Sequence, residues 1–316
     1  MAVFISVMNQ RPKQTVITEV ALDKGMGESF VEKDWFVIQV IAAIATIEHE
    51  GFEVIFAGGT ALSKAHKLLQ RFSEDVDFRV LVSEPSLNRK ALSGFRHVVV
   101  ESLRKCRFTI ADTQIQARNS NRFFSIDLDY ETYFSRADAL RPHIQIELTA
   151  SNTQLPPIYL PVSSFVNELT NQPPEVARIG CIDPVESATD KLSAIAWRIP
   201  DRVRGGQYDD PALVRHIHDL AILKDLALVH ADFPGLVATS MREDNKRAKN
   251  DPSFSGLPVN EKFQRMLDIL VMDREYAQEY DRFVKGVSYA TEGNVPDFAK
   301  AIEAIRLLIK AVSPMR

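Results

Sequence analysis

The stretch FAGGTALSKAHKLLQRFSEDVDFRV, residues 56–80, decides the fold that the sequence predicts. An apolar run over 52–58 meets a glycine pair, and apolar residues at helical spacing follow over 60–72. This order predicts a strand that passes directly into a helix of about four turns. A second strand is predicted over 75–82, where apolar and polar residues alternate.

Gly58 and Gly59 lie where the first strand passes into the helix. Glycine lets the backbone approach a bulky ligand, and a helix N-terminus offers free N–H groups to phosphate. Thr60 adds a hydroxyl donor. These residues predict a phosphate-binding turn. The alternative is an ordinary strand-to-helix connection, because a glycine pair alone is a weak signal.

Asp75 and Asp77 stand two positions apart in the second strand. Such side chains point the same way, so both carboxylates are expected at one point while Val76 and Phe78 pack into the core. Two like charges this close repel, and a divalent metal with oxygen ligands relieves the repulsion. The pair therefore predicts a magnesium site, the alternative being the solvated face of an edge strand.

A third carboxylate, Glu147, belongs to a predicted strand over 143–151 with alternating apolar and polar residues. We expect this strand beside the one that carries the aspartate pair. Three strand-borne carboxylates and a glycine turn are what metal-assisted phosphoryl or nucleotidyl transfer requires.

The rest of the first half predicts a mixed sheet flanked by helices, in the α+β class. A long helix is expected to begin with a capping box of Ser29 and Glu32 and to end at Gly51. Further patterns predict a helix over 86–106 and strands over 108–117 and 122–132. Residues 1–165 are therefore assigned to one domain.

The composition changes where LPPIYLPVSS and TNQPPEV concentrate prolines, as connecting segments often do. Beyond them, Asp183, Pro184 and Glu186 predict the capped start of a helix. Helical periodicity continues over 212–229, 260–284 and 295–312. Residues 176–316 are assigned to a second, mainly helical domain.

The bulk composition excludes several classes of protein. The 316 residues carry a net charge of −4, which gives no global electrostatic case for nucleic acid. Cys106 and Cys181 are too few for a disulfide framework and are expected to be unpaired structural thiols. The apolar run WFVIQVIAAIATI is too short to span a bilayer. A cytoplasmic protein without membrane partners is expected.

The stretch GGTALSKAHKLLQRFSEDVDF resembles the signature of the AbiEii/AbiGii toxin family, nucleotidyltransferase-like proteins of the DNA polymerase beta superfamily that include the MenT toxins. The resemblance extends from VEKDWFVIQV through IQIELTAS to DKLSAIAWR and RHIHDLAIL. It implies a polymerase-beta-like core, a helical C-terminal region, magnesium-dependent transfer from a nucleoside triphosphate, and a partner antitoxin encoded nearby. In some members the acceptor is the 3′ end of tRNA.

The resemblance places the glycine motif on Gly58, Gly59 and Thr60 and the metal pair on Asp75 and Asp77. Thr60 stands where the wider superfamily often has serine, which keeps the hydroxyl.

Four further residues suit phosphate. Arg71 and Ser73 lie beside the aspartate pair, with a helix C-terminal charge and a turn residue as their alternative roles. Lys191 and Arg198 are seven residues apart on a predicted helix and share nearly the same face. They would neutralise triphosphate charge, or form an ordinary solvated stripe.

In RHIHDL the family pattern is closer to R-D-x-x-D-L, so Arg215 and Asp219 match while His216 replaces an acidic residue. Asp219 is expected to orient Lys191 or to assist the acceptor. The alternative is a helix-surface carboxylate.

The sequence thus predicts a nucleotidyltransferase that moves a nucleoside monophosphate from a nucleoside triphosphate to an acceptor hydroxyl, with the tRNA 3′ end expected from the resemblance. Arg202, Arg204 and Gly205 would form a mobile arm over the nucleotide or an RNA end. Two other interpretations stay open: transfer to a protein or small molecule, and a catalytically silent module that binds a nucleotide or partner.

Overall fold

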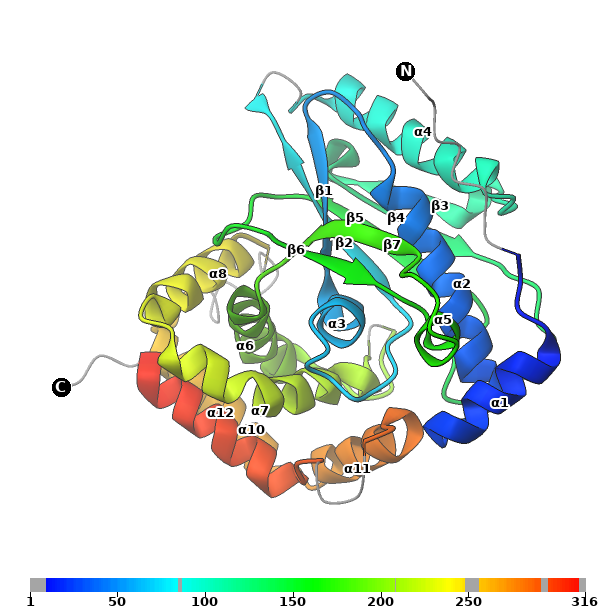
Figure 1. Ribbon diagram of the computed structural model, residues 1–316. Helices are drawn as coiled ribbons and strands as arrows, with labels where there is room; N and C mark the ends of the chain where they lie inside the picture. Colours follow the sequence, from blue (N-terminus) through cyan, green and yellow to red (C-terminus); the bar gives the residue numbers. More distant parts are fainter. Residues whose placement is uncertain (1–9, 85–86, 208, 248–255, 291–294, 313–316) are drawn as a thin grey trace. The chain divides into compact units, whose positions relative to one another are not determined.

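The computed structural model describes residues 10–84, 87–207, 209–247, 256–290 and 295–312. The chain divides into two compact units, Met1–Ile182 and Asp183–Arg316. The first unit contains a sheet with flanking helices, and the second consists of helices (Figure 1). The predicted fold class, a mixed sheet flanked by helices with helices in the C-terminal part, is confirmed. None of the described helices combines the length and the apolar composition that a membrane span needs.

The described part of the first unit holds a seven-stranded mixed sheet in the order β3-β4-β5-β2-β1-β7-β6. The interior strand β1 pairs antiparallel with β2 and parallel with β7, and the central strand β2 pairs parallel with β5. The strands are β1 (Phe52–Ala57), β2 (Val76–Val82), β3 (Ile115–Arg118), β4 (Phe123–Leu128), β5 (Ile144–Ala150), β6 (Ile158–Val162) and β7 (Val176–Cys181). β1, β2 and β5 therefore lie together in the middle of the sheet.

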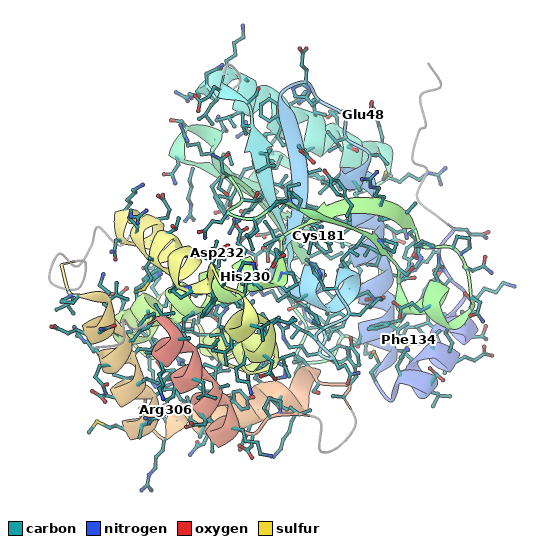
Figure 2. The ribbon with its side chains drawn as sticks, turned by 60° about the vertical axis from the view of Figure 1, so that its left-hand side comes forward. Glu48, Phe134, Cys181, His230, Asp232 and Arg306 are labelled. Atoms are coloured by element: carbon teal, nitrogen blue, oxygen red, sulfur yellow. The ribbon has the colours of Figure 1, made fainter. Side chains whose placement is uncertain are left out.

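Helices of the first unit cover the apolar side chains of these strands. The helix α2 packs against α4 along the sheet, and their apolar residues join those of the strands in one core (Figure 1). Cys181 is fully buried in this core (Figure 2). The helices are α1 (Gln14–Lys24), α2 (Glu28–Ala45), α4 (Arg89–Lys105), α5 (Phe165–Leu169), and a short α3 (Gly58–Thr60) followed by the π-helical turn η1 (Ala61–Ala65).

The helix α2 is present as predicted, but its predicted ends are wrong. It begins after Gly27 without a side-chain cap and ends at Ala45. Gly51, with a φ of +79°, lies instead in the turn before β1. Glu32 is 1% exposed because its carboxylate accepts hydrogen bonds from Arg11 and from the amide of Tyr133, so it takes no part in a capping box.

The predicted helix over 60–72 is also too long. Helical structure stops at Ala65, and Lys67 adopts a φ of +56°. Leu69 and Phe72 are buried without belonging to a helix. The chain from His66 to Asp75 therefore returns as an irregular segment to the start of β2.

Two further regions differ from the sequence prediction. The proline-rich region forms β6, α5 and β7, all in the first unit. Pro161 is tolerated in β6 because this strand lies at the sheet edge. The single helix predicted over 260–284 is two helices, because Asp273 ends one and accepts a hydrogen bond from the amide of Glu275, which begins the next.

The second unit is built around the helices α6 and α7, which pack against each other. The predicted start of α6 is confirmed, since the carboxylate of Asp183 accepts from the amide of Val185 at 2.7 Å and Pro184 is the first helical residue. The helices are α6 (Pro184–Asp201), α7 (Val214–Val229), α8 (Phe233–Arg247), α10 (Val259–Met272), α11 (Glu275–Val287) and α12 (Phe298–Val312).

Candidate active site

The glycine turn lies against Asp77 of β2. Gly58 follows the end of β1 with a φ of +75°, in the left-handed region that favours glycine. A Cβ atom at Gly58 would lie 2.0 Å from Oδ2 of Asp77, too close for any side chain. Glycine is therefore required here by the backbone conformation and by the approach of the carboxylate.

Arg71 and Ser73 lie against the second glycine. A Cβ atom at Gly59 would lie 2.6 Å from Nη2 of Arg71 and 3.0 Å from Oγ of Ser73. Arg71 is buried, and its Nη1 donates to the carbonyl oxygen of Phe72 at 3.1 Å. Because helical structure ends at Ala65, Arg71 is not a helix C-terminal charge. The structure thus brings both predicted phosphate contacts to the glycine turn.

Thr60 joins the glycine turn to the start of β2. Its side chain is fully buried, and Oγ1 donates to the carbonyl oxygen of Asp75 at 2.5 Å. The hydroxyl proton that was expected to bind a phosphate thus makes a hydrogen bond within the protein. Thr60 fixes the backbone of Asp75 relative to the turn.

Two of the three predicted carboxylates, Asp77 and Glu147, come from neighbouring strands, and the third precedes one of these strands. β2 and β5 are parallel, and their register places Asp77 beside Glu147, as expected from the sequence. Oε1 of Glu147 accepts from Nε2 of Gln145 at 2.8 Å. Asp75 lies one residue before β2, not within it as predicted, and its Oδ1 accepts from Nη1 of Arg141 at 2.6 Å.

The donor set fits a hard divalent cation. Asp75, Asp77 and Glu147 offer carboxylate oxygens, which magnesium prefers. Among the residues that the structure describes, no three His, Cys, Asp or Glu side chains form a complete metal centre. Magnesium is usually held by one or two carboxylates together with substrate phosphates. A site in which the protein supplies only some of the ligands is therefore consistent with magnesium binding.

In the second unit, Lys191 of α6 and Asp219 of α7 form a buried ion pair. Their Nζ and Oδ2 atoms lie 2.9 Å apart, and the side chains are 9% and 0% exposed. Nδ1 of His218 lies 3.3 Å from the other oxygen of Asp219. The structure therefore brings together the lysine and the aspartate that were expected to interact, and Asp219 is not a surface carboxylate.

Arg198 lies on α6 beside His216, the residue that departs from the family pattern. Nη2 of Arg198 donates to Asp210 at 2.8 Å, and Nη1 lies 3.5 Å from Nε2 of His216. Burial and the neighbouring cations Lys191, Arg215 and Arg198 hold the pKa of His216 well below its usual value. The imidazole is therefore neutral at pH 7.

Arg202 and Arg204 are packed rather than mobile. Arg202 donates to both carboxylate oxygens of Glu279, at 2.7 and 2.8 Å, and to Asp209 at 2.7 Å. Arg204 donates to Asp273 at 2.8 Å and also pairs with Glu279. This network contradicts the prediction of a mobile arm.

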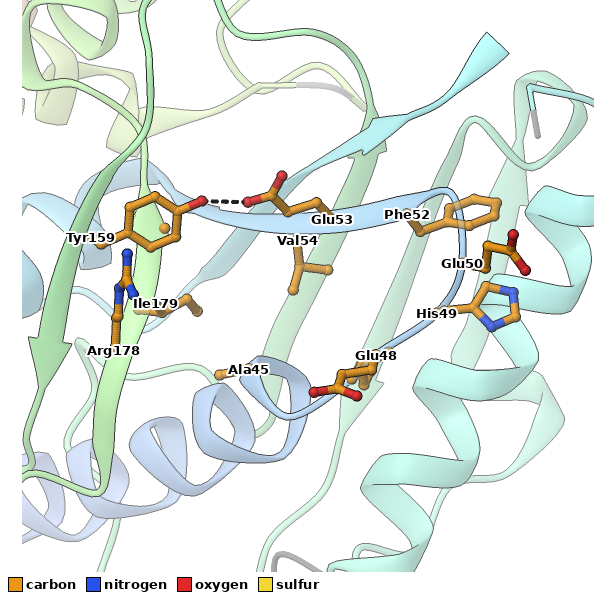
Figure 3. A pocket seen from close by; sticks show the side chains of 12 residues that line it. Ala45, Glu48, His49, Glu50, Phe52, Glu53, Val54, Tyr159, Arg178 and Ile179 are labelled. Carbon is orange, nitrogen blue, oxygen red and sulfur yellow. Dashed lines mark hydrogen bonds between the residues drawn. The ribbon is translucent and has the colours of Figure 1, made fainter. Parts of the chain in front are cut away.

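A hollow of about 750 Å³ lies in the first unit, at the end of β1 opposite to the glycine turn (Figure 3). Its lining includes Glu48, Glu53 and Arg178, and the hydroxyl of Tyr159 donates to Glu53 at 2.7 Å. None of the residues predicted for the site lines it.

Four residues around the three carboxylates were not predicted from the sequence. Arg141 and Gln145 contact Asp75 and Glu147, and Lys33 and Glu74 contact the backbone of Arg141. The one available signal in the sequence was Lys33, a charged residue within a helix that is otherwise predicted to be mostly buried. Its partners, 41 and 108 residues away, leave no local pattern.

Comparison with known proteins identifies the family of this chain. The family model "Nucleotidyl transferase AbiEii toxin, Type IV TA system" matches residues 42–304. No curated protein matches the chain. The fold is similar to that of MenT4, a nucleotidyltransferase toxin from Mycobacterium tuberculosis, with a TM-score of 0.50 and 14% identity over 94% of this chain and 99% of that one. Since the family model covers most of its length, including the glycine turn and all three carboxylates, the chain belongs to the AbiEii family of nucleotidyl transferase toxins of type IV toxin–antitoxin systems.

Proposed function

We propose that the protein is a magnesium-dependent enzyme that transfers a nucleoside monophosphate from a nucleoside triphosphate to an acceptor hydroxyl, with the 3′ end of tRNA as acceptor. The observation that carries the proposal is the parallel register of Asp77 and Glu147, with the glycine turn packed on Asp77. The first unit, Met1–Ile182, would supply the catalytic core, and the second unit, Asp183–Arg316, the helical domain.

Asp75 and Asp77 would hold the cation with the triphosphate, and Gly58, Gly59 and Thr60 would form the turn on which the phosphates lie. Carboxylates beside a glycine turn that opens a helical segment suit an anionic ligand that arrives with its own cation. When bound, magnesium offsets negative charge on the attacking and leaving oxygens. Arg71 and Ser73, packed on Gly59, would contact phosphate oxygens from the side.

The acceptor hydroxyl would attack the α-phosphorus, forming a new oxygen–phosphorus bond while the bond to the pyrophosphate breaks. Glu147, held by Gln145, would take the hydroxyl proton and pass it to solvent. The products are the nucleotidylated acceptor and pyrophosphate.

Lys191 and Arg198 would supply positive charge for the triphosphate. Asp219 would orient Lys191, in keeping with the 2.9 Å ion pair between them. His216, neutral where the family pattern has an acidic residue, reduces the negative charge beside these cations.

The acceptor is proposed from the resemblance to a family in which some members modify tRNA, and a separate antitoxin would control the activity. The net charge of −4 means that tRNA binding would depend on local cations rather than on a global field.

The test is to incubate the protein with each α-labelled nucleoside triphosphate, magnesium and total tRNA. We expect label on tRNA with the intact protein and none with the double variant Asp75→Ala/Asp77→Ala. The double variant Asp112→Ala/Asp138→Ala, which removes two exposed acids of the first unit, is the matched control and should stay active.

Parallel incubations with cell extract and small molecules identify other acceptors. Label confined to protein or a small molecule would refute the tRNA acceptor, and nucleotide binding without transfer would refute the enzyme. Growth on induction is measured separately. Equal growth with the intact protein and the inactive variant would argue against toxicity.

A further inference from the structure

Lys33 is a fully buried lysine on α2. Its Nζ donates to the carboxylate of Glu74 and to the carbonyl oxygens of Arg141 and His143, at 2.8 and 2.9 Å. Lys33 therefore joins the segment before β2 to the segment before β5. These are the two segments that lead into the strands of Asp77 and Glu147.

Glu74 also holds the backbone of Arg141. Its Oε2 accepts from the backbone amide of Arg141 at 3.0 Å, while it also pairs with Lys33. Arg141 is thus fixed at its N–H by Glu74 and at its carbonyl oxygen by Lys33.

The side chain of Arg141 extends from this fixed backbone to the carboxylates. Nη1 donates to Oδ1 of Asp75 at 2.6 Å and also to Oε1 of Gln145. Gln145 in turn donates to Glu147 at 2.8 Å. A continuous set of hydrogen bonds therefore runs from Lys33 to two of the three carboxylates.

Stability is a weak reason to bury such a pair. The loss of hydration on burial is costly, and it lowers the pKa of Lys33 despite the attraction of Glu74. Apolar residues of similar volume often serve stability as well as a buried ion pair does. What the Lys33–Glu74 pair does is to fix the positions of the segments before β2 and β5.

We propose that Lys33 and Glu74 are positioning residues for nucleotidyl transfer, which fix Arg141 and, through Arg141 and Gln145, hold the carboxylates of Asp75 and Glu147 in the orientation that the reaction uses. The proposal takes the roles of Asp75 and Glu147 from the function proposed above. A structural role alone would stabilise the segments without affecting the reaction.

The test variant is Lys33→Met/Glu74→Gln, which removes both charges together and leaves Arg141 in the sequence. We expect kcat to fall about tenfold or more, because small displacements of reacting groups cost up to about 100-fold, with less than about a threefold change in KM for the triphosphate. The affinity for Mn²⁺, measured by electron paramagnetic resonance of the free ion, should fall about 3- to 10-fold, because freed side chains must be ordered again.

The matched control is Asp34→Asn/Lys64→Met. Asp34 is the next residue on α2, and it forms an ion pair with Lys64 at 2.8 Å in which both side chains are buried. The other oxygen of Asp34 accepts from the amide of Phe165 at 2.7 Å, so this pair fixes the start of α5. The control should lose thermal stability to a similar degree while keeping kcat and Mn²⁺ affinity.

Arg141 variants show whether the effect passes through the guanidinium. Arg141→Ala should lower kcat at least as much as Lys33→Met/Glu74→Gln, and combining all three changes should add little further loss. Arg141→Lys should recover part of the rate, because it can still donate to Asp75.

Unchanged kcat and Mn²⁺ affinity in Lys33→Met/Glu74→Gln, with only the thermal midpoint lowered, would overturn the proposal, as would full additivity with Arg141→Ala. If that variant does not fold, Glu74→Gln alone carries the test, with the same expected directions. If the intact protein transfers no nucleotide, the proposed function fails, and Mn²⁺ affinity still decides the positioning role.

Discussion

Replacing Gly58 by alanine tests the contact between the glycine turn and Asp77. The φ of +75° costs a non-glycine residue about 1–2 kcal/mol. The new Cβ would also lie 2.0 Å from Oδ2, 2.9 Å from Cγ and 3.0 Å from Cβ of Asp77, so the carboxylate must move as a whole. We expect the free energy of unfolding to fall by about 2–3 kcal/mol in total, within the usual range for a strained substitution.

Thermal and urea unfolding followed by circular dichroism measure this loss. For a unit of this size about 2–3 kcal/mol lowers the midpoint by roughly 4–12 °C. Gly94→Ala is the matched control, because Gly94 lies exposed within α4 and nothing lies within 4 Å of an added Cβ. The same substitution there should raise the free energy of unfolding by about 0.5–1 kcal/mol.

A double-mutant cycle separates the two costs at Gly58. In an Asp77→Ala background the collision with the carboxylate is gone, so Gly58→Ala should cost only the backbone part of about 1–2 kcal/mol. Nucleotide transfer by Gly58→Ala alone should fall toward the level of Asp77→Ala. A wild-type midpoint, or an equal cost in both backgrounds, would refute the contact.

Three further outcomes are expected. Asp219→Ala leaves the buried ammonium of Lys191 without its partner and should lower the free energy of unfolding by about 3–5 kcal/mol in urea; a loss below about 1 kcal/mol would argue against a buried pair. The depressed pKa of His216 means that the unfolded chain takes up a proton near pH 6.5 that the folded chain does not, so stability should fall from pH 7.5 to 5.5 with a slope of up to about 1.4 kcal/mol per pH unit. His216→Gln should reduce that slope, and an unchanged slope would contradict the assignment. Burial raises the pKa of Cys181 to about 12 and also encloses Cys106, so neither thiol should react with a thiol reagent before unfolding, and labelling of the native protein would count against their burial.

The central strands and the glycine turn were predictable because their signals are local. Alternation places Val76 and Phe78 in the core and identifies β2, and the same pattern identifies β5. The partnership of Asp77 with Glu147 followed because both strands carry acidic residues on their polar faces.

The failures have physical causes. Leu69 and Phe72 stand at positions that suit a helix, yet they are buried by an irregular segment, because the turn at Lys67 redirects the chain. Strands β6 and β7 were not predicted because β6 contains a proline and β7 follows two. Pro161 is compatible with a strand because β6 lies at the sheet edge, where its missing N–H leaves no hydrogen bond unmade. Arg141 was missed because its hydrogen bonds reach residues far away in the sequence, so no local pattern indicates them.

The pairing of β1 with β7 has a consequence for synthesis of the chain. Phe56 pairs with Cys181, and the amide of Ile182 donates to the carbonyl oxygen of Phe56 at 2.9 Å. These two paired residues are 125 positions apart, 181 minus 56, and a ribosome that adds about 5–20 residues per second needs about 6–25 s to make that length. Throughout this interval one edge of β1 is open to pairing with other nascent chains. Slow translation of this part of the message would therefore favour aggregation over completion of the sheet.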